Sequence, residues 1–350
     1  MKFIQIADVH LGVKPDAGKP WSERRAEDIW SSFAGVVRLA AKEEADLLLI
    51  AGDLFHRQPL KRELKEVAAL FGELKNTQIV LAAGNHDYMH PKSYYRSFVW
   101  PEHVHFIAGE DLEPVYLSSL DVTVWGSSYW GPEDKRHIYQ TGKLDGRGLQ
   151  ILLGHGGDEK HHPFTLTELQ EAGYDYAAFG HIHIPQKLKD HKVIMSGSLE
   201  PTDCNDFGPH GYWMGELYKD SCQVQFYPVK NCEYVKTTVE ITPDMGQRQM
   251  IEAAREQLSA REAFQISHLI LSGRRDADME VPVEELQQLP RVVKVLDMTG
   301  ADYCFEKLKE DYSGTLLAAF IEYMEGVSDQ RLKEDALYYG VQAMFEAMNE

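Results

Sequence analysis

The sequence predicts an α/β protein in which two sheets pack face to face and helices cover their outer sides. Short continuous apolar runs alternate with segments whose apolar residues recur at helical spacing, the pattern of right-handed β-α-β units and a mostly parallel sheet. Polar residues that can bind metals follow five of these apolar runs. Because ligand sites in such sheets lie at the carboxyl ends of the strands, we expect these residues to share one edge.

The first strands and the helices between them come early in the chain. Residues 2–7 and 79–82 are predicted strands, and residues 47–51 form an apolar run typical of a strand covered on both faces. Helices are expected at about 22–42 and 60–75, where apolar residues recur every three or four positions. These elements predict a parallel core.

The strands after Asn85 are shorter, and we assign them to a second sheet. Residues 149–153 and 174–179 return to the buried type, and a hairpin is expected around Asp190 and His191. The remaining predicted strands of the second sheet are residues 104–107, 115–117, 122–125, 212–214 and 224–227.

The length of 350 residues predicts two domains, and the character of the sequence changes near residue 230. We predict a first domain over 1–230 and a small β-α-β-α-β domain over 231–300. Residues 301–350 are predicted to form a helical tail, because their apolar residues recur at helical spacing.

Composition indicates a globular protein with no membrane segment. The chain is 43% hydrophobic and 26% charged, no apolar run approaches the ~20 residues that cross a bilayer, and the N-terminus leads into a strand rather than a signal peptide. The four cysteines show no CxxC spacing, so a reducing, cytoplasmic setting is expected. The net charge of −19 argues against binding nucleic acid by bulk electrostatics, but it neither indicates nor excludes a nucleic-acid substrate.

The polar residues after the apolar runs predict a site for two metal ions. His181 and His183 can face one cavity, because alternate side chains of an extended backbone share a face. The whole set is too large for one tetrahedral ion, and the carboxylate of Asp53 is the natural bridge between two. No cysteine joins the set, and its oxygen and nitrogen donors suit Mn²⁺, Fe or Zn²⁺. The seven candidate ligands are Asp8, His10, Asp53, Asn85, His155, His181 and His183.

Such a site predicts hydrolysis of a phosphoester. Two ions ~3.5–4 Å apart clamp the attacking and leaving oxygens of a phosphoryl centre and make hydroxide available at neutral pH. We interpret His86 as the catalytic residue, with Asp87 holding its tautomer; the alternative is that His86 caps the following helix. Glycines next to the ligands permit close approach of the backbone to the metals, and they are Gly52, Gly84, Gly154 and Gly180.

Taken in order, the five clusters resemble the motifs of the calcineurin-like metallophosphoesterase superfamily. They are Asp8-Val9-His10, Gly52-Asp53, Gly84-Asn85-His86-Asp87, Gly154-His155 and Gly180-His181-Ile182-His183. Residues 52–56, 196–200 and 208–212 further resemble the SbcD/Mre-eleven branch of DNA double-strand-break repair nucleases. This resemblance implies a four-layer α/β/β/α sandwich in which the small domain after residue 230 is a capping domain.

The resemblance also implies roles and partners. Asp53 would be shared by two metals, one held with Asp8, His10 and His183, the other with Asn85, His155 and His181. His86 would act on the transition state, and His56 would lie beside the first metal as part of the catalytic group. Mn²⁺ would be the metal and DNA ends the substrate. The chain would form a homodimer through helices near the second motif, and an SbcC/Rad-fifty-type coiled-coil ATPase would dock on the helices after Gly314.

Two other functions stay open at this point. One is a phosphodiesterase acting on nucleotides or other small phosphodiesters, and the other is a non-catalytic metal-binding scaffold for an ATPase. Candidate phosphate contacts near the site are few, and each is more often a solvated surface charge: Lys14, Lys61, Arg62, Lys92 and Arg96. His161, His162 and His210 lie outside the motifs and are treated as loop residues.

Overall fold

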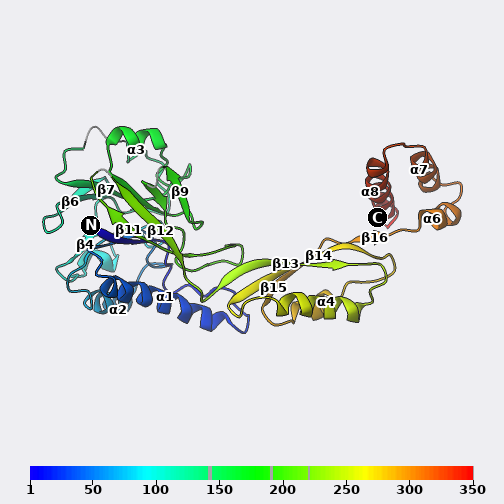
Figure 1. The fold of residues 1–350 in the computed structure, drawn as a ribbon, viewed down its shortest axis with the longest axis horizontal. Coiled ribbons are helices and arrows are strands. Elements are labelled where there is room, and N and C mark those ends of the chain that lie inside the picture. The colour runs from blue at the N-terminus through cyan, green and yellow to red at the C-terminus, as the bar shows by residue number, and fades with distance from the viewer. Residues whose placement is uncertain (141–143, 190–191, 220, 350) are drawn as a thin grey trace. The chain divides into compact units, whose positions relative to one another are not determined.

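The computed structural model describes residues 1–140, 144–189, 192–219 and 221–349, and it divides into two compact units, Met1–Tyr234 and Val235–Glu350 (Figure 1). The division lies four residues beyond the boundary expected at residue 230, and residues 301–350 belong to the second unit. The hairpin expected around Asp190 and His191 lies outside the described residues.

The first sheet has six strands in the order β12-β11-β1-β2-β3-β4. Its parallel strands are β1 (Lys2–Ile6), β2 (Leu47–Ala51), β3 (Gln78–Ala82) and β4 (Val104–Ile107). On the other side of β1, the antiparallel strands β11 (Gly211–Leu217) and β12 (Cys222–Pro228) complete the sheet.

The assignment of residues 104–107, 212–214 and 224–227 to the second sheet was wrong. β4 pairs with β3, with Ile79 beside Val104, and β11 pairs with β1. The local pattern identifies these segments as strands. A strand joins one of the sheet edges that it can reach in the folded chain. The alternation of its side chains does not predict which edge that is.

The second sheet also has six strands, in the order β5-β6-β7-β8-β10-β9. Its parallel strands are β6 (Val122–Gly126), β7 (Leu149–His155), β8 (Tyr176–Gly180) and β10 (Val193–Met195). The edge strands β5 (Glu113–Leu117) and β9 (Gln186–Lys189) are antiparallel to their neighbours.

Apolar side chains fill three interfaces in the first unit and so define four layers. Leu49 and Leu153 pack between the two sheets. The helices α1 (Ser22–Lys42) and α2 (Lys61–Phe71) cover the outer face of the first sheet, and α3 (Leu166–Ala172) covers that of the second (Figure 1). The predicted α/β/β/α fold class is confirmed.

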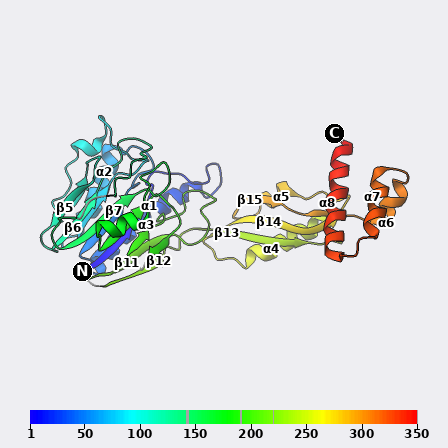
Figure 2. The ribbon, with the colours of Figure 1, turned by 90° about the horizontal axis from the view of Figure 1, so that it is seen from above.

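The second unit is built on a smaller sheet in the order β13-β14-β15, with β16 paired to β14 (Figure 2). Its elements are β13 (Glu233–Ile241), α4 (Gln247–Ser259), β14 (Gln265–Asp276), α5 (Val283–Gln287), β15 (Val292–Asp297) and β16 (Gly300–Asp302). Three helices with their own apolar cluster follow: α6 (Phe305–Asp311), α7 (Leu316–Glu325) and α8 (Gln330–Asn349). In the described part of the chain, every helix is too short or too polar to cross a bilayer.

A buried ion pair ties α1 to the loop after β10. The carboxylate of Glu200, 1% exposed, lies 3.2 Å from the guanidinium of Arg25 and accepts a 2.6 Å hydrogen bond from Ser32. Glu200→Ala removes the nearer of the two carboxylates beside the buried Arg25 and leaves that of Asp28 at 3.7 Å, so we expect the first unit to lose about 3 kcal/mol of unfolding free energy.

Chemical denaturation followed by tryptophan fluorescence measures this loss. The control is Glu23→Ala, which opens the exposed pair between Glu23 of α1 and Lys14 and should leave stability unchanged within error. Equal losses of unfolding free energy in Glu200→Ala and Glu23→Ala would contradict the prediction.

Candidate metal centre

The carboxyl ends of strands from both sheets meet at one site. Asp8 follows β1, Asp53 follows β2, His155 ends β7 and His181 follows β8. Backbone hydrogen bonds fasten the loops after β1 and β2 together, from the nitrogen of Asp8 to the carbonyl of Gly52 (3.2 Å) and from His10 to Asp53 (3.0 Å). The fold therefore delivers residues from distant parts of the chain to the same place.

Four of the predicted ligands have left-handed backbone conformations. The φ angle is +48° at Asp8, +51° at His10, +50° at Asp53 and +89° at His181. In residues other than glycine such conformations are sparsely populated, cost about 1–3 kcal/mol and cluster at functional sites. The turns after the strands hold these residues in strained conformations at the point where their side chains converge.

The first group of ligands consists of Asp8, His10 and His183, whose donor atoms lie within 4.8 Å of one another. Nε2 of His10 is 3.2 Å from Nε2 of His183 and 3.8 Å from Oδ2 of Asp53. Two imidazole nitrogens that face each other beside carboxylates are oriented as ligands of one cation would be.

The second group surrounds the amide oxygen of Asn85. That oxygen lies 2.9 Å from Nε2 of His155 and 3.1 Å from Nδ1 of His181. Nε2 of His155 is also 3.5 Å from Oδ2 of Asp53. The same carboxylate oxygen therefore faces both groups, which is the position that a bridging ligand needs.

The nitrogen that each histidine presents is set by the partner of its other nitrogen. Nδ1 of His155 lies 2.8 Å from the carbonyl of Ala51, and a carbonyl only accepts, so the proton is on Nδ1 and Nε2 is free for a metal. Nδ1 of His183 lies 3.2 Å from the carboxylate of Asp206, and its Nε2 faces His10.

The charges of this site are buried. None of the ion pairs that the seven ligands make among the described residues involves a lysine or an arginine. Burial raises the pKa of Asp8 to about 6 and lowers the pKa of His10 to about 3. Burial also opposes the charged form of His155, but the carboxylates of Asp53 and Asp8 and the carbonyl of Ala51 together outweigh it and raise the pKa of His155 to about 9. The donor set fits divalent cations, which would supply the positive charge that these buried carboxylates lack.

Two glycines are required by the close packing of the ligands. A Cβ at Gly84 would overlap Oδ1 and the backbone nitrogen of Asp53, and a Cβ at Gly52 would overlap the ring of His155. Any larger residue would displace the bridging carboxylate or the histidine beside it. The glycines of these two motifs thus serve the geometry of the ligands.

His86 lies at the exposed rim of the site. Its backbone nitrogen donates to Oδ1 of Asp53 (2.8 Å). Its Nδ1 is 3.2 Å from the carbonyl of His56, and the imidazole rings of His56 and His86 stack with their centroids 5.2 Å apart. The chain is irregular from His86 to the short 3₁₀ helix η1 (Tyr94–Ser97), so His86 caps no helix. Donor atoms of His10, His56 and His86 also lie within 4.8 Å of one another.

The predicted role of Asp87 was wrong. Its buried carboxylate accepts hydrogen bonds from the backbone nitrogens of Phe55 (3.1 Å) and Gly84 (2.8 Å) and from the hydroxyl of Tyr95 (2.8 Å). Burial raises the pKa of Asp87 to about 7, and these donors oppose the shift. Asp87 therefore fastens the turn that carries His86 to the loop after β2, and the carbonyl of His56 orients the His86 ring.

Sequence reasoning missed two carboxylates that contact the paired histidines. Asp206 lies at Nδ1 of His183, and Oδ2 of Asp158 lies 2.8 Å from Nε2 of His181. Neither aspartate stands in a motif. Only the folded distance identifies them, because the loops that carry them have no local pattern that points to the site.

The histidines outside the motifs have separate environments. His161 packs its ring on that of His181, with centroids 4.2 Å apart. His162 is buried, and its Nε2 lies 2.9 Å from the carboxylate of Asp134. Nδ1 of His210 is 2.8 Å from the hydroxyl of Ser198, in the stretch 196–200.

Together, the four-layer fold and the two ligand groups that share an aspartate define a metal-dependent phosphoesterase. A family model described as calcineurin-like phosphoesterase matches residues 1–185, and the chain belongs to that family. The family uses divalent metal ions; the residues that would hold them here are the seven of the two groups described above.

Among curated proteins, the metallophosphoesterase YhaO of Bacillus subtilis is 26% identical over 302 residues, which cover 78% of this chain and 72% of that protein. The DNA double-strand break repair protein Mre11 of Archaeoglobus fulgidus is 30% identical over 260 residues, which cover 66% of this chain and 57% of that protein. Among solved structures, TT1561 of Thermus thermophilus aligns with a TM-score of 0.40 and 10% identity over 64% of this chain and 98% of that one.

Proposed function

We propose that this protein is a metal-dependent phosphodiesterase that cleaves DNA from its ends, as an exonuclease and endonuclease in DNA repair. The observation that carries the proposal is the gathering of the seven candidate ligands in two groups that share Asp53, with His86 exposed at their rim. The similarity to the archaeal Mre11, which its name describes as a DNA double-strand break repair protein, supports DNA as the substrate.

The proposed chemistry divides between the ions and the protein. Two divalent ions, Mn²⁺ in our proposal, would polarise the phosphoryl oxygens and activate water as the nucleophile when bound. The protein's part is to place Asp53 between the two ligand groups and to direct His86 toward the substrate. Since the carbonyl of His56 accepts from Nδ1 of His86, Nε2 of this exposed ring is the nitrogen left for the substrate and, when protonated, can donate to the leaving oxygen.

His56 contributes to this arrangement in two ways. Its ring stacks on His86, and its Nδ1 lies 3.4 Å from Nδ1 of His10. It thereby connects a ligand residue to the proposed proton donor, and we place it in the catalytic group as the residue that positions His86.

A phosphodiesterase for nucleotides or other small phosphodiesters is the second candidate. It is favoured by two cations beside the site motifs that are already held in ion pairs, Lys14 with Glu23 (2.9 Å) and Arg57 with Glu63 (2.8 Å).

One set of assays separates the two candidates. Purified protein is supplied with Mn²⁺ and offered linear duplex DNA, hairpin DNA, covalently closed circular DNA, mononucleotide phosphodiesters and a chromogenic phosphodiester. Degradation of linear and hairpin DNA with sparing of the closed circle supports action at DNA ends. A preference for mononucleotides by several orders of magnitude in kcat/KM would contradict the DNA proposal while leaving the phosphoesterase chemistry in place.

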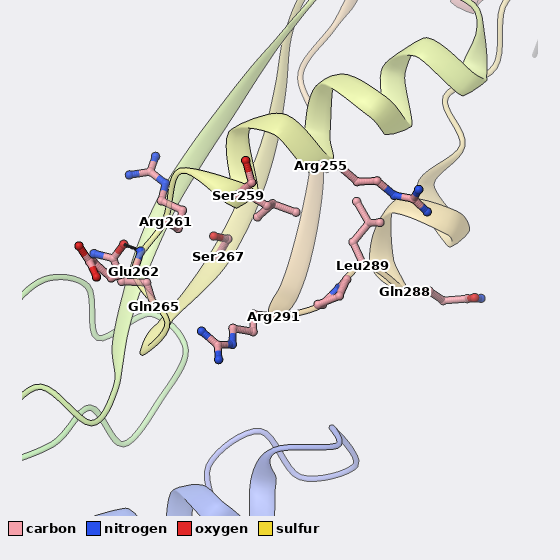
Figure 3. A pocket seen from close by; sticks show the side chains of 11 residues that line it. Arg255, Ser259, Arg261, Glu262, Gln265, Ser267, Gln288, Leu289 and Arg291 are labelled. Atoms are coloured by element: carbon pink, nitrogen blue, oxygen red, sulfur yellow. Dashed lines mark hydrogen bonds between the residues drawn. The ribbon is translucent and has the colours of Figure 1, made fainter.

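A cluster of arginines in the second unit supports contact with a phosphate chain. A cavity of about 460 Å³ lies between the end of α4 and the loop before β15, and Arg255, Arg261 and Arg291 border it (Figure 3). Among the described residues that line it, Glu262 is the only acidic one. Guanidinium groups bind phosphate oxygens strongly, so we propose that this cavity binds the DNA backbone.

Arg255→Ala combined with Arg291→Ala is expected to weaken DNA binding regardless of sequence and to lower the salt slope of log K by about 1 per residue, with turnover of the chromogenic phosphodiester unchanged. Binding isotherms at several salt concentrations measure the affinity for DNA and its salt slope. The control is Arg248→Ala, because Arg248 is exposed on the same helix and pairs with Glu252. An equal loss of DNA affinity in Arg248→Ala would show that the effect comes from the overall charge of the protein and not from the cavity.

We also propose a homodimer and a coiled-coil ATPase partner of the SbcC/Rad-fifty type. Large apolar side chains on the last two helices are exposed, at 75% for Leu316 and 76% for Tyr323 on α7 and at 74% for Tyr339 on α8. Leu316 and Tyr323 are seven residues apart and share a face of α7, which suits docking of another helix. Light scattering tests the dimer, and co-purification tests the ATPase contact.

A further inference from the structure

Both ring nitrogens of His181 have a partner in the structure. Nδ1 lies 3.1 Å from Oδ1 of Asn85, in the second ligand group, and Nε2 lies 2.8 Å from Oδ2 of Asp158. An ionised carboxylate only accepts, so the proton of the neutral imidazole is on Nε2. The lone pair of Nδ1 is then directed toward the metal position.

The carboxylate of Asp158 is itself held in place by its own loop. Its Oδ1 accepts from the backbone nitrogens of Lys160 (2.8 Å) and His161 (3.0 Å) and lies 2.8 Å from Nδ1 of His161. Nδ1 of His161 also lies 3.0 Å from Oδ2, so Oδ2 faces the rings of both His161 and His181. The ring of His161 packs on that of His181, so the loop after β7 contacts the ligand by both a hydrogen bond and a ring contact.

The neighbouring ligand has the opposite arrangement. His183 presents Nε2 to the first group and has Asp206 at its Nδ1, whereas His181 presents Nδ1 and has Asp158 at its Nε2. Each of the paired histidines thus has its own carboxylate from its own loop. An imidazole can ligate through either nitrogen, so a partner is needed to select one.

We propose that Asp158 is a positioning residue of the metal centre, which fixes His181 in the Nε2–H tautomer and thereby sets the affinity of the second group for its ion. This proposal rests on the metal-dependent phosphoesterase chemistry and is independent of DNA as the substrate. The competing possibility is a third ion, because donor atoms of Asp158, His161 and His181 also lie within 4.8 Å of one another. A third ion would require Nε2 of His181 as a ligand rather than as a donor.

The test compares Asp158→Asn with wild type in the full chain, and it uses Asp158→Glu as the conservative variant. The control is Asp134→Asn, because the carboxylate of Asp134 lies 2.9 Å from Nε2 of His162, a buried histidine that belongs to neither ligand group. Two readouts need no substrate: the His181 tautomer in metal-free protein, from ¹⁵N chemical shifts, and the affinity and stoichiometry of Mn²⁺ binding by calorimetry. Thermal unfolding shows that each variant is folded.

We expect the Nε2–H tautomer at His181 in wild type and a loss of about 10- to 100-fold in affinity for one of two ions in Asp158→Asn. Asp158→Glu should recover part of the affinity, and Asp134→Asn should match wild type. Unchanged affinity, an Nδ1–H tautomer in wild type, or three ions in wild type and two in Asp158→Asn would each overturn the proposal. Failure to cleave DNA would affect none of these readouts.

Discussion

Asp53→Ala is expected to lower phosphodiester hydrolysis by about 10³-fold or more and to abolish the stabilisation of the protein by divalent ions. Oδ2 of Asp53 lies 3.8 Å from Nε2 of His10 and 3.5 Å from Nε2 of His155, so this one carboxylate serves both ligand groups. Its loss removes a ligand from each ion and the negative charge that offsets their mutual repulsion.

Thermal unfolding with and without Mn²⁺ directly measures the expected loss of stabilisation by divalent ions. An ion at 100 times its dissociation constant stabilises the wild-type fold by about 2.7 kcal/mol, and Asp53→Ala should show no such gain. The control is Asp121→Asn, which changes a carboxylate on a surface turn, where Asn tolerates the observed φ of +52°. An undiminished Mn²⁺-induced shift in Asp53→Ala would contradict the bridging role.

His86→Ala is expected to lower kcat on DNA by about 10²–10⁴-fold while Mn²⁺ stoichiometry stays at the wild-type value. The loss should be much smaller on a chromogenic phosphodiester with an acidic leaving group, because such a group departs without a proton. This difference between substrates is the signature of a proton donor. It follows from the hydrogen bond of Nδ1 of His86 to the carbonyl of His56, which leaves Nε2 for the substrate.

Single-turnover rates on both substrates, with calorimetry of Mn²⁺ binding, test the role of His86. The control is His137→Ala, because the side chain of His137 is 51% exposed and pairs with Glu168 away from the ligand groups. Equal losses on the two substrates would exclude proton donation. The loss of one ion in His86→Ala would instead make His86 a ligand, together with His10 and His56.

The pattern of strands and ligands was predictable from the sequence because it is local. A strand covered on both faces is a continuous apolar run, as in β2 and β8, and a ligand at its carboxyl end follows within a few residues. The fold class and the family follow from these runs and motifs. The seven candidate ligands could be chosen from the sequence, although their distances from one another could not.

Contacts between segments that are distant in sequence were not predictable. β4, β11 and β12 were recognised as strands but assigned to the wrong sheet, since pairing depends on which edges lie within reach. Asp87 was assigned to its neighbour His86, whereas the folded turn directs its carboxylate to Phe55 and Tyr95.

The sequence by itself determined the chemical identity of the donors, their order and their places at strand ends, because residue type and local spacing contain that information. The tertiary structure alone decided which nitrogen each histidine presents, since the partners that select it, such as Ala51 for His155 and Asp158 for His181, come from other segments of the chain. Hydrogen bonds of this kind depend on distances between segments that meet only when the two sheets pack.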